Sequence, residues 1–368
     1  MSYGNYPNLS LVKKALVIKL RHHGDVLLTS PVFSNLQAAM PQAQIDALVY
    51  KETFPMLEGH PAIHQLIAYD RSWKKLRLVG RLSKEWALLK TIRKKGYDLV
   101  INLTEGDRGA IIAFASGAPL KVGIDPEGQG FLGKRKIYTH LVKMCKTPRH
   151  TVEKNLDAIR KIGIFPTPEE RDLFLSIPAE SKERVNLLLG EQQIASGNYF
   201  LLHPVSRWRF KCWPTSLVAK LIEQLHARGE KIVMSSSPDP QELKMVEEIL
   251  NLVPHVPVVN LGGKISLKEL GALIEKSKCL VSVDSVPLHI SSALKTPAVV
   301  LFGPSSELNW GPWQNPKARV VAQNLGCRPC FMDGCGGSKK SDCLQTLPVA
   351  KVLKAIDEVV VQEPVQVL

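Results

Sequence analysis

The chain has 368 residues, of which 45% are hydrophobic and 22% are charged. This balance excludes a disordered chain, and the length is typical of two globular domains. No stretch approaches the roughly 18 consecutive apolar residues of a membrane-spanning helix, and the start, MSYGNYPNLSLVKKALVIKL, lacks a signal-peptide cleavage site, so we expect a protein kept in the cytoplasm.

The net charge of +14 is unevenly distributed along the chain. Residues 1–180 contain 27 Lys and Arg against 17 Asp and Glu, whereas the remainder contains 21 against 17. A basic half of this kind favours an acidic partner, such as nucleic acid, anionic lipid or a phosphorylated substrate.

The N-terminal half alternates between runs rich in Val, Ile and Leu, typical of strands, and longer runs typical of helices. Strands that alternate with helices indicate a parallel sheet with helices on both faces. The predicted strands cover 15–20, 44–50, 63–69 and 97–103, and the predicted helices cover 31–40, 52–58, 81–95 and 107–116.

The same pattern restarts after 163–180, a stretch rich in Pro and acidic residues that we interpret as a linker. We expect two Rossmann-like, doubly wound domains over 1–170 and 171–345, facing a central cleft, with ligands beyond the carboxyl ends of the strands. The last segment, 346–368, is expected to form a helix that could pack back on the N-terminal domain. In the second half, strands are predicted over 199–205, 231–237, 256–262, 278–284 and 297–303, and helices over 214–228, 240–251, 266–276 and 287–294.

A single acid, Asp25, follows the first predicted strand in KLRHHGDVLLTSP, residues 19–31. One interpretation is a helix N-cap, because Asp is favoured there and a Gly before it suits a tight turn. The other is a general base held at a strand end, within hydrogen-bond reach of the proton that it removes. Residue types alone favour neither. The surrounding residues are candidates to contact an acidic acceptor: Lys19, Arg21, His22, His23 and Gly24.

A polar and basic loop, HPVSRWRFKCWP, follows the predicted strand 199–205. Ser206 and Lys211 lie in this loop with two arginines, just before a helix that opens near Pro214, where the missing N–H costs nothing. A hydroxyl and several cations before a helix N-terminus suit a phosphate or a pyrophosphate. A solvated basic loop is the alternative, but the density of cations at a strand end favours anion binding.

Two further strand ends carry polar residues. In VSVDSVPLHISSAL, Asp284 and Ser285 follow a strand and His289 lies one turn into the next helix, a pattern that suits a phosphate. In SSSPDPQEL, Asp239 and Glu242 are candidates to bind ribose or sugar hydroxyls. Singly, each residue is more simply a helix cap or a buried side chain, but together on one sheet edge they favour a nucleotide site. The absence of a G-x-G-x-x-G after a strand and of a P-loop motif argues against a dinucleotide oxidoreductase and a P-loop NTPase.

The segment 71–95 contains ten Lys and Arg against one acid, Glu85, together with Trp73, Trp86 and several Leu. A basic amphipathic helix with aromatic residues is typical of a membrane-surface contact, and a helix whose apolar side packs on its own domain is the alternative. We expect both in part: the Leu face packs inward, and the charged face meets anionic lipid or the acceptor.

Four cysteines cluster near the C-terminus. In a cytoplasmic protein their spacing resembles a metal-ligand loop more than a disulfide framework, but it matches no standard zinc pattern. Reduced thiols and disulfides are alternatives, so we predict no metal. The four are Cys327, Cys330, Cys335 and Cys343.

Three of these stretches, KLRHHGDVLLTSP, FKCWP and VDSVPLHISSAL, resemble the lipopolysaccharide heptosyltransferases of glycosyltransferase family 9, and KLRHHGD, VYKET and DSVPLH resemble the heptosyltransferase III branch. The resemblance covers nearly the whole chain. It implies a GT-B fold with an acceptor-binding N-terminal domain and a nucleotide-sugar-binding C-terminal domain. It also implies inverting transfer of heptose, from ADP-L-glycero-β-D-manno-heptose to the lipopolysaccharide inner core, with no cofactor.

On this resemblance, Asp25 matches the family's catalytic Asp, Lys211 its phosphate-binding Lys, and Asp284 and His289 its donor motif, whereas Val286 stands where the family often has Gly. The resemblance implies a peripheral enzyme on the cytoplasmic face of the inner membrane, which binds the lipopolysaccharide core and an anionic membrane surface but no nucleic acid. The alternatives are a related GT-B transferase with another donor or acceptor, an inactive relative, and a basic nucleic-acid-binding α/β protein. Basic runs outside the segment 71–95 carry almost no aromatic residues, which argues against the last alternative.

Overall fold

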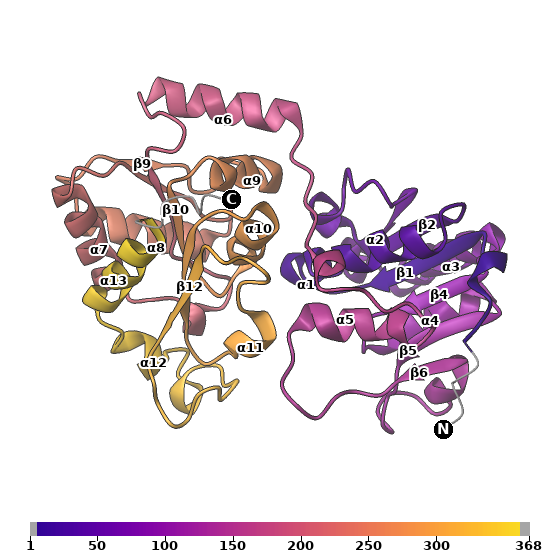
Figure 1. Cartoon of the computed structure of the whole chain (residues 1–368). Helices are drawn as coiled ribbons and strands as arrows, with labels where there is room; N and C mark the ends of the chain where they lie inside the picture. The colour runs from indigo at the N-terminus through magenta and orange to yellow at the C-terminus, as the bar shows by residue number, and fades with distance from the viewer. Residues whose placement is uncertain (1–5, 361–368) are drawn as a thin grey trace. The chain divides into compact units, whose positions relative to one another are not determined.

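The computed structural model describes residues 6–360. The chain divides into two compact units, Met1–Ser176 (unit 1) and Ile177–Leu368 (unit 2), and each has a central sheet covered by helices (Figure 1). The division falls inside the stretch predicted as a linker, slightly beyond the predicted boundary at residue 170.

Over its described residues, unit 1 contains a six-stranded parallel sheet with the strand order β3-β2-β1-β4-β5-β6. The strands are β1 (Lys14–Lys19), β2 (Gln44–Tyr50), β3 (Gln65–Tyr69), β4 (Leu99–Asn102), β5 (Leu120–Ile124) and β6 (His140–Val142). The α-helices are α1 (His23–Leu27), α2 (Ser30–Ala39), α3 (Leu78–Lys95), α4 (Asp107–Ser116) and α5 (Thr151–Arg160), and the 3-10 helices are η1 (Leu9–Leu11), η2 (Lys51–Met56), η3 (Arg71–Lys75), η4 (Lys134–Ile137) and η5 (Glu169–Arg171).

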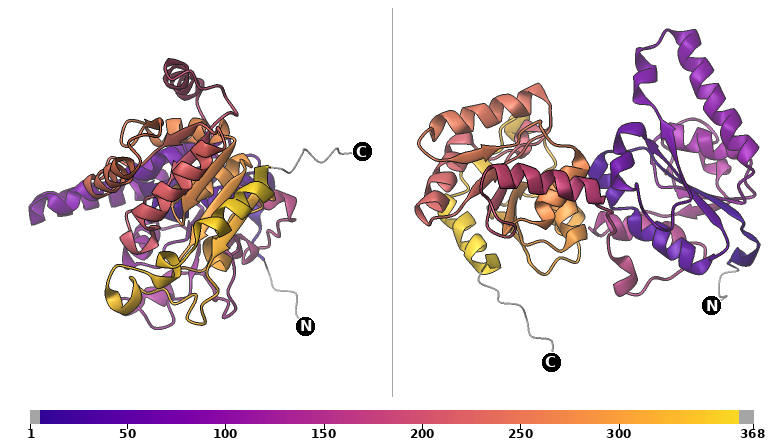
Figure 2. Two further views of the ribbon diagram at one scale, coloured as in Figure 1. Left: turned by 90° about the vertical axis from the view of Figure 1, so that its left-hand side faces the viewer. Right: turned by 90° about the horizontal axis from the view of Figure 1, so that it is seen from above.

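The central strand β1 is buried from Ala15 to Lys19, as expected of a parallel strand with helices on both faces. α2 packs with α5, and α3 packs with α4. The right-hand view of Figure 2 shows that the first half of α3 extends beyond the rest of the unit. Leu88 and Ile92, in the second half, are its buried residues. The prediction that the Leu face packs inward is therefore wrong for the first half of this helix.

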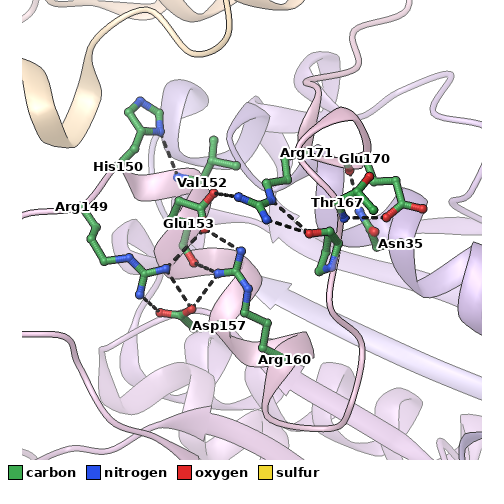
Figure 3. A network of polar contacts seen from close by, with 11 residues as sticks. Asn35, Arg149, His150, Val152, Glu153, Asp157, Arg160, Thr167, Glu170 and Arg171 are labelled. Atoms are coloured by element: carbon green, nitrogen blue, oxygen red, sulfur yellow. Dashed lines mark hydrogen bonds and ion pairs between the residues drawn. The ribbon is translucent and has the colours of Figure 1, made fainter.

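A network of charged side chains fastens the end of unit 1 to α5 (Figure 3). Glu153 Oε2 accepts a hydrogen bond from Arg160 Nη2 at 2.6 Å, and Glu153 Oε1 accepts one from Arg171 Nη1 at 3.1 Å. Arg149 Nη1 donates to Asp157 Oδ2 at 2.9 Å. Because Arg149 precedes α5 and Arg171 lies in η5, the network holds the segments on both sides of α5 to that helix.

Over its described residues, unit 2 contains a second six-stranded parallel sheet, with the order β12-β11-β10-β7-β8-β9. The strands are β7 (Phe200–His203), β8 (Ile232–Met234), β9 (Val258–Asn260), β10 (Cys279–Val283), β11 (Ala298–Phe302) and β12 (Ala318–Ala322). The α-helices are α6 (Ala179–Glu191), α7 (Thr215–Ala227), α8 (Pro240–Leu252), α9 (Leu267–Glu275), α10 (Val286–Leu294), α11 (Glu307–Trp310), α12 (Asp342–Gln345) and α13 (Val349–Val360), and the 3-10 helices are η6 (Arg209–Lys211) and η7 (Cys335–Gly337).

The last helix, α13, belongs to the core of unit 2. It contacts α7, β10, β11 and β12, and its apolar residues Val352, Ile356 and Val359 are buried. Their spacing places them on one apolar stripe of the helix. This stripe packs against the sheet of unit 2. The expectation that a helix over 346–368 packs back on the N-terminal domain is therefore corrected for α13, and residues 361–368 lie outside the described part of the chain.

Each sheet has one point at which the chain order reverses. It lies between β1 and β4 in unit 1 and between β7 and β10 in unit 2. Ligands of doubly wound sheets bind beyond the carboxyl ends of the strands at this topological switch point. None of the helices over residues 6–360 combines the length and the apolar character needed to cross a membrane.

Candidate active site

The switch point of unit 2 brings together the loops that follow four neighbouring strands, β11, β10, β7 and β8. Because these strands are parallel, their carboxyl ends meet at one edge of the sheet. The predicted donor residues from three strand ends therefore share this edge. They are Ser206 and Lys211 after β7, Asp239 and Glu242 after β8, and Asp284, Ser285 and His289 after β10.

The central contact of this edge joins Lys211 to Asp284. Asp284 is only 5% exposed, and its Oδ2 lies 2.6 Å from the Lys211 Nζ. The same oxygen accepts a hydrogen bond of 2.5 Å from Ser305 Oγ, in the loop after β11. Ser305 was not among the predicted residues, although the run FGPSS at the end of a strand was a signal for it. One buried carboxylate thus holds a cation and a hydroxyl from two other loops.

The loop that carries Lys211 is anchored to the C-terminal segment at two points. The buried Trp213 donates its Nε1–H to Leu347 O at 3.1 Å. Phe210 O accepts a hydrogen bond of 2.7 Å from Ser341 Oγ. Lys211 therefore extends from a fixed loop, so its ammonium is held in place before any anion binds.

The start of α10 lies beside this cation. Ser285 is the N-cap of the helix, but it makes no side-chain capping hydrogen bond, and its Oγ donates to Val283 O at 3.3 Å. Backbone N–H groups in the first turn of a helix without such a cap suit an anion. His289 is buried one turn further on.

The two acids after β8 have different environments. Asp239 is exposed and caps α8, because its Oδ1 accepts from Gln241 N at 2.9 Å and from Glu242 N at 3.4 Å. Glu242 is buried, and its Oε2 accepts from Ser237 N at 3.0 Å. The helix-cap interpretation therefore accounts for Asp239. Glu242 instead places a buried carboxylate at the carboxyl edge of the sheet in unit 2.

Asp25 lies at the switch point of unit 1, just beyond β1. The N-cap of α1 is His22, and Asp25 lies within the first turn of that helix at a half-buried position. The structure therefore assigns the cap to another residue and removes the N-cap interpretation of Asp25. Its role as a general base stays a prediction.

The side chain of Lys19 is buried, although the sequence predicts that it contacts the acceptor. Its Nζ donates to Leu103 O at 3.1 Å and to Asn155 Oδ1 at 3.0 Å. Burial lowers the pKa of Lys19 to about 8, against the opposing influence of the nearby Asp25. Lys19 therefore ties β1 to the end of β4 and to α5, and we assign it a positioning role.

The neighbouring basic residues differ in their burial and in their hydrogen-bond partners. His23 Nε2 donates to Glu52 O at 2.8 Å, and burial lowers the pKa of His23, so a neutral ring fastens α1 to η2. Arg21 lies 4.0 Å from Glu105, and both side chains are more than half exposed, so this ion pair contributes little to stability. Arg21 is thus presented to solvent four residues before Asp25, while Gly24 is buried in α1.

The cysteine cluster has free thiols. Cys327, Cys330 and Cys335 are exposed, and Cys343 is buried. Burial raises the pKa of Cys343 to about 11. Within residues 6–360, no group of three or more His, Cys, Asp or Glu side chains is arranged to hold a metal ion.

The switch points of the two units present different chemical groups. Unit 2 presents an ammonium group and a helix start, groups of the kind that stabilise negative charge on a leaving group. Unit 1 presents a half-buried carboxylate on a short helix that a neighbouring His fastens in place. The chain thus has a lysine beside a helix start on unit 2 and a half-buried carboxylate on unit 1.

Comparison with known proteins gives a consistent result. The profile of the family described as glycosyltransferase family 9 (heptosyltransferase) matches residues 85–340. The chain is 33% identical over 339 residues to lipopolysaccharide heptosyltransferase 3 of Escherichia coli, covering 92% of this chain and 97% of that protein. The predicted resemblance to this family, including its heptosyltransferase III branch, is confirmed.

Solved structures confirm the predicted fold class. A family 9 glycosyltransferase from Veillonella parvula DSM 2008 matches with a TM-score of 0.81 and 22% identity, covering 98% of this chain and 100% of that one. The E. coli ADP-heptose lipopolysaccharide heptosyltransferase II matches with a TM-score of 0.75 and 23% identity, covering 95% and 99%. Structures of this family have the GT-B fold, which this chain shares.

Proposed function

Since the chain belongs to glycosyltransferase family 9 (heptosyltransferase), we propose that it moves L-glycero-D-manno-heptose from ADP-heptose to a heptose of the lipopolysaccharide inner core, with inversion at the anomeric carbon. The observation that carries this proposal is the contact between Lys211 and the buried Asp284 at the switch point of unit 2. It supplies a fixed cation where a nucleotide diphosphate binds in doubly wound sheets.

Unit 2 binds the donor. Lys211 and the first turn of α10 face the diphosphate, and the Ser206 and Ser285 hydroxyls donate to its oxygens. Asp284 is an anion itself, so it acts through Lys211, which it orients. Glu242 accepts hydrogen bonds from hydroxyls of the nucleotide sugar. These groups also stabilise the charge that ADP carries as it leaves.

Unit 1 binds the acceptor and supplies the base. The acceptor hydroxyl attacks the anomeric carbon, and Asp25 takes the proton that this oxygen loses. The bond from the anomeric carbon to the ADP oxygen breaks, and ADP leaves with the electron pair. Attack from the face opposite the leaving group inverts the configuration at this carbon.

The acceptor is an acidic glycolipid, and the charge of the chain fits it. The N-terminal half carries most of the +14, and Arg21, four residues before Asp25, is exposed. We propose that the enzyme binds peripherally to the cytoplasmic face of the inner membrane, where anionic lipid and the acceptor attract the same cations. We expect no nucleic acid partner.

The test is ADP release from ADP-heptose with a heptose-terminated core acceptor. Asp25→Asn is expected to bind ADP normally and to lose catalysis by about a hundredfold or more, the scale of a general base. Asp239→Asn is the matched control, because it changes an acid of unit 2 that caps a helix, and we expect it to retain activity. Full activity of Asp25→Asn would contradict the mechanism, and a wild type without turnover would contradict the donor or the function.

A further inference from the structure

A groove of about 1110 Å³ opens on unit 1 between α3, α4 and the segment around β5 and η4. Its apolar lining includes Trp86 of α3 and Ile111 and Phe114 of α4. Trp86 is 70% exposed and Phe114 is 69% exposed. Two large aromatic side chains that face solvent at the same groove indicate a surface that binds something apolar.

The polar lining of this groove has one sign of charge. It carries the cations Lys90, Arg93, Lys94, Lys121 and Lys136. No acidic side chain is among its lining residues in the described part of the chain. An occupant must therefore combine an apolar part with an anionic part.

The exposed apolar surface continues along α3 beyond the groove. Leu78, Leu82 and Trp86 recur every four residues and so lie on one stripe of the helix, with Val79 beside it. All four are more than half exposed. This is the part of α3 that extends from the unit in Figure 2. We call these four residues, with Ile111 and Phe114, the α3–α4 face.

α3 extends from the groove toward the carboxyl edge of the sheet, the edge that carries Asp25. α3 follows β3 and precedes β4, and Tyr69 Oη, at the end of β3, donates to Glu85 Oε1 near the middle of α3 at 2.7 Å, so the middle of the helix lies near the carboxyl end of β3 and its last turn toward the opposite edge of the sheet. Lys121, at the start of β5, places the groove toward that opposite edge. A surface bound to this face would thus lie on the same unit as Asp25.

We propose that the α3–α4 face docks unit 1 on an anionic lipid bilayer, with Trp86 and Phe114 among the acyl chains and the groove cations on the lipid phosphates. Apolar insertion beside several lysines and arginines is the pattern of proteins that lie on such membranes. The inference deepens the proposed function, because it names the surface that would bring unit 1 to a membrane-embedded acceptor.

Charge complementarity favours this occupant over the others. A second copy of the chain would bring like charges together, because its own face carries the same cations. Nucleic acid would satisfy the cations but would leave the aliphatic stripe of Leu78, Val79 and Leu82 in water. An anionic bilayer satisfies both parts of the surface.

Vesicle flotation of the full chain tests the proposal. Vesicles of phosphatidylcholine mixed with phosphatidylglycerol are expected to bind the wild type more tightly than phosphatidylcholine alone. The double variant Trp86→Ser with Phe114→Ser is expected to weaken this binding by about tenfold or more. The matched control is Leu187→Ser with Leu252→Ser, two exposed apolar residues of unit 2, which should bind like the wild type.

A second pair of variants tests the charge. The double variant Lys90→Glu with Lys94→Glu should abolish the preference for phosphatidylglycerol. The control is Lys220→Glu with Lys354→Glu, an equal change of charge at exposed positions of unit 2, which should keep this preference. If both pairs lose the preference equally, net charge and not this face attracts the vesicles, and the proposal is wrong.

Fluorescence quenching by lipids with brominated acyl chains tests insertion. Quenching of the wild type that disappears in Trp86→Phe would place this side chain among the acyl chains. Equal quenching in both proteins would overturn the proposal. It would also be overturned if a DNA duplex bound the chain in competition with the vesicles. Self-association of the chain that Trp86→Ser abolishes would overturn it too.

Activity separates this proposal from the proposed function. The Trp86→Ser with Phe114→Ser variant should release ADP at the wild-type rate with a soluble, delipidated acceptor and slowly with an acceptor in vesicles. If the wild type binds vesicles through this face but never releases ADP, the proposed function fails and the docking surface stands. An equal loss of rate on both acceptors would show a folding defect in place of a docking surface.

Discussion

The Lys211 ammonium lies 2.6 Å from Oδ2 of Asp284, an oxygen that also accepts a hydrogen bond from Ser305. Asp284 is buried, and a buried carboxylate that loses its cation is left with a large desolvation penalty. Lys211 is therefore held at the end of β10 before a donor arrives. If this edge binds the donor diphosphate as proposed, the contact explains why an acid belongs there: it positions the Lys211 cation.

The first prediction concerns this pair. Asp284→Asn is expected to raise the KM for ADP-heptose about tenfold, and Lys211→Met to lower kcat/KM by about 10²–10³, the scale of one charged donor to a leaving group. Because Asp284 acts through Lys211, the double variant should lose little more than Lys211→Met alone. Steady-state ADP release measures all three variants, and fully additive losses would show that Asp284 contacts the donor independently.

The second prediction concerns the buried Lys19. Burial lowers its pKa to about 8 from an ordinary 10.5, so the folded protein binds fewer protons than the unfolded chain between these values. The free energy of unfolding of the wild type should therefore rise, relative to Lys19→Met, by roughly 1–3 kcal/mol between about pH 8 and 10.5. Urea unfolding of both proteins across this range measures the difference, and a difference that stays constant with pH would contradict it.

Elements with a strong pattern were predicted well. α4 covers 107–116 as predicted, because its apolar run is bounded by Gly106 and Gly117. The predicted helix 52–58 is the 3-10 helix η2, which contains Pro55. β6 and β12 were missed: both are edge strands, β6 has only three residues, and the pairing of each strand depends on a neighbour in the folded sheet. β5, α5 and α6 were not predicted either, and α6 begins inside the predicted linker.

Side-chain partners were beyond prediction for a different reason. The carboxyl-end rule placed Asp284 and Lys211 on one edge, but it does not specify which atoms meet there. The hydrogen bond between Lys19 and Asn155 joins residues 136 positions apart, and only the folded chain shows that it makes Lys19 a buried residue. The apolar stripe of α3 could be predicted only in part for the same reason. Periodicity predicts the stripe, but it does not predict which residues of the stripe are buried in the folded chain.

The third prediction concerns Glu153 in the network of Figure 3. Burial alone would raise its pKa, but the hydrogen bond from Arg160 and the charges of Arg160, Arg171 and Arg149 outweigh burial and lower it. Glu153→Gln should lower the free energy of unfolding by roughly 1–3 kcal/mol at neutral pH, since hydrogen bonds to charged groups are lost. This difference should be complete above the unfolded pKa of about 4.3 and shrink as pH falls through the folded pKa.

Urea unfolding at neutral and acidic pH measures this difference, with Glu183→Gln, an exposed acid of α6, as the control. The control should change stability little at either pH. If Glu153→Gln is as stable as the wild type at neutral pH, the network does not fasten the end of unit 1 to α5.

The fourth prediction separates the two acids after β8. Glu242 is buried, whereas Asp239 is exposed. The Asp239 carboxylate already accepts hydrogen bonds from backbone N–H groups in the first turn of α8. If Glu242 binds hydroxyls of the nucleotide, Glu242→Gln should weaken ADP binding about tenfold, the cost of one lost charged hydrogen bond. Asp239→Asn should bind ADP like the wild type, because Asn is an equally good N-cap.

Isothermal titration of ADP into each variant measures the two affinities, and thermal unfolding shows whether either fold has changed. The backbone contact from Ser237 to Glu242 is preserved by Gln, so a loss of affinity without a loss of stability would assign the carboxylate to the ligand. Weaker binding in Asp239→Asn alone would reverse the assignment, since the cap would then have a second role at the site. Equal affinity in both variants would place the hydroxyl contacts elsewhere on the edge of unit 2.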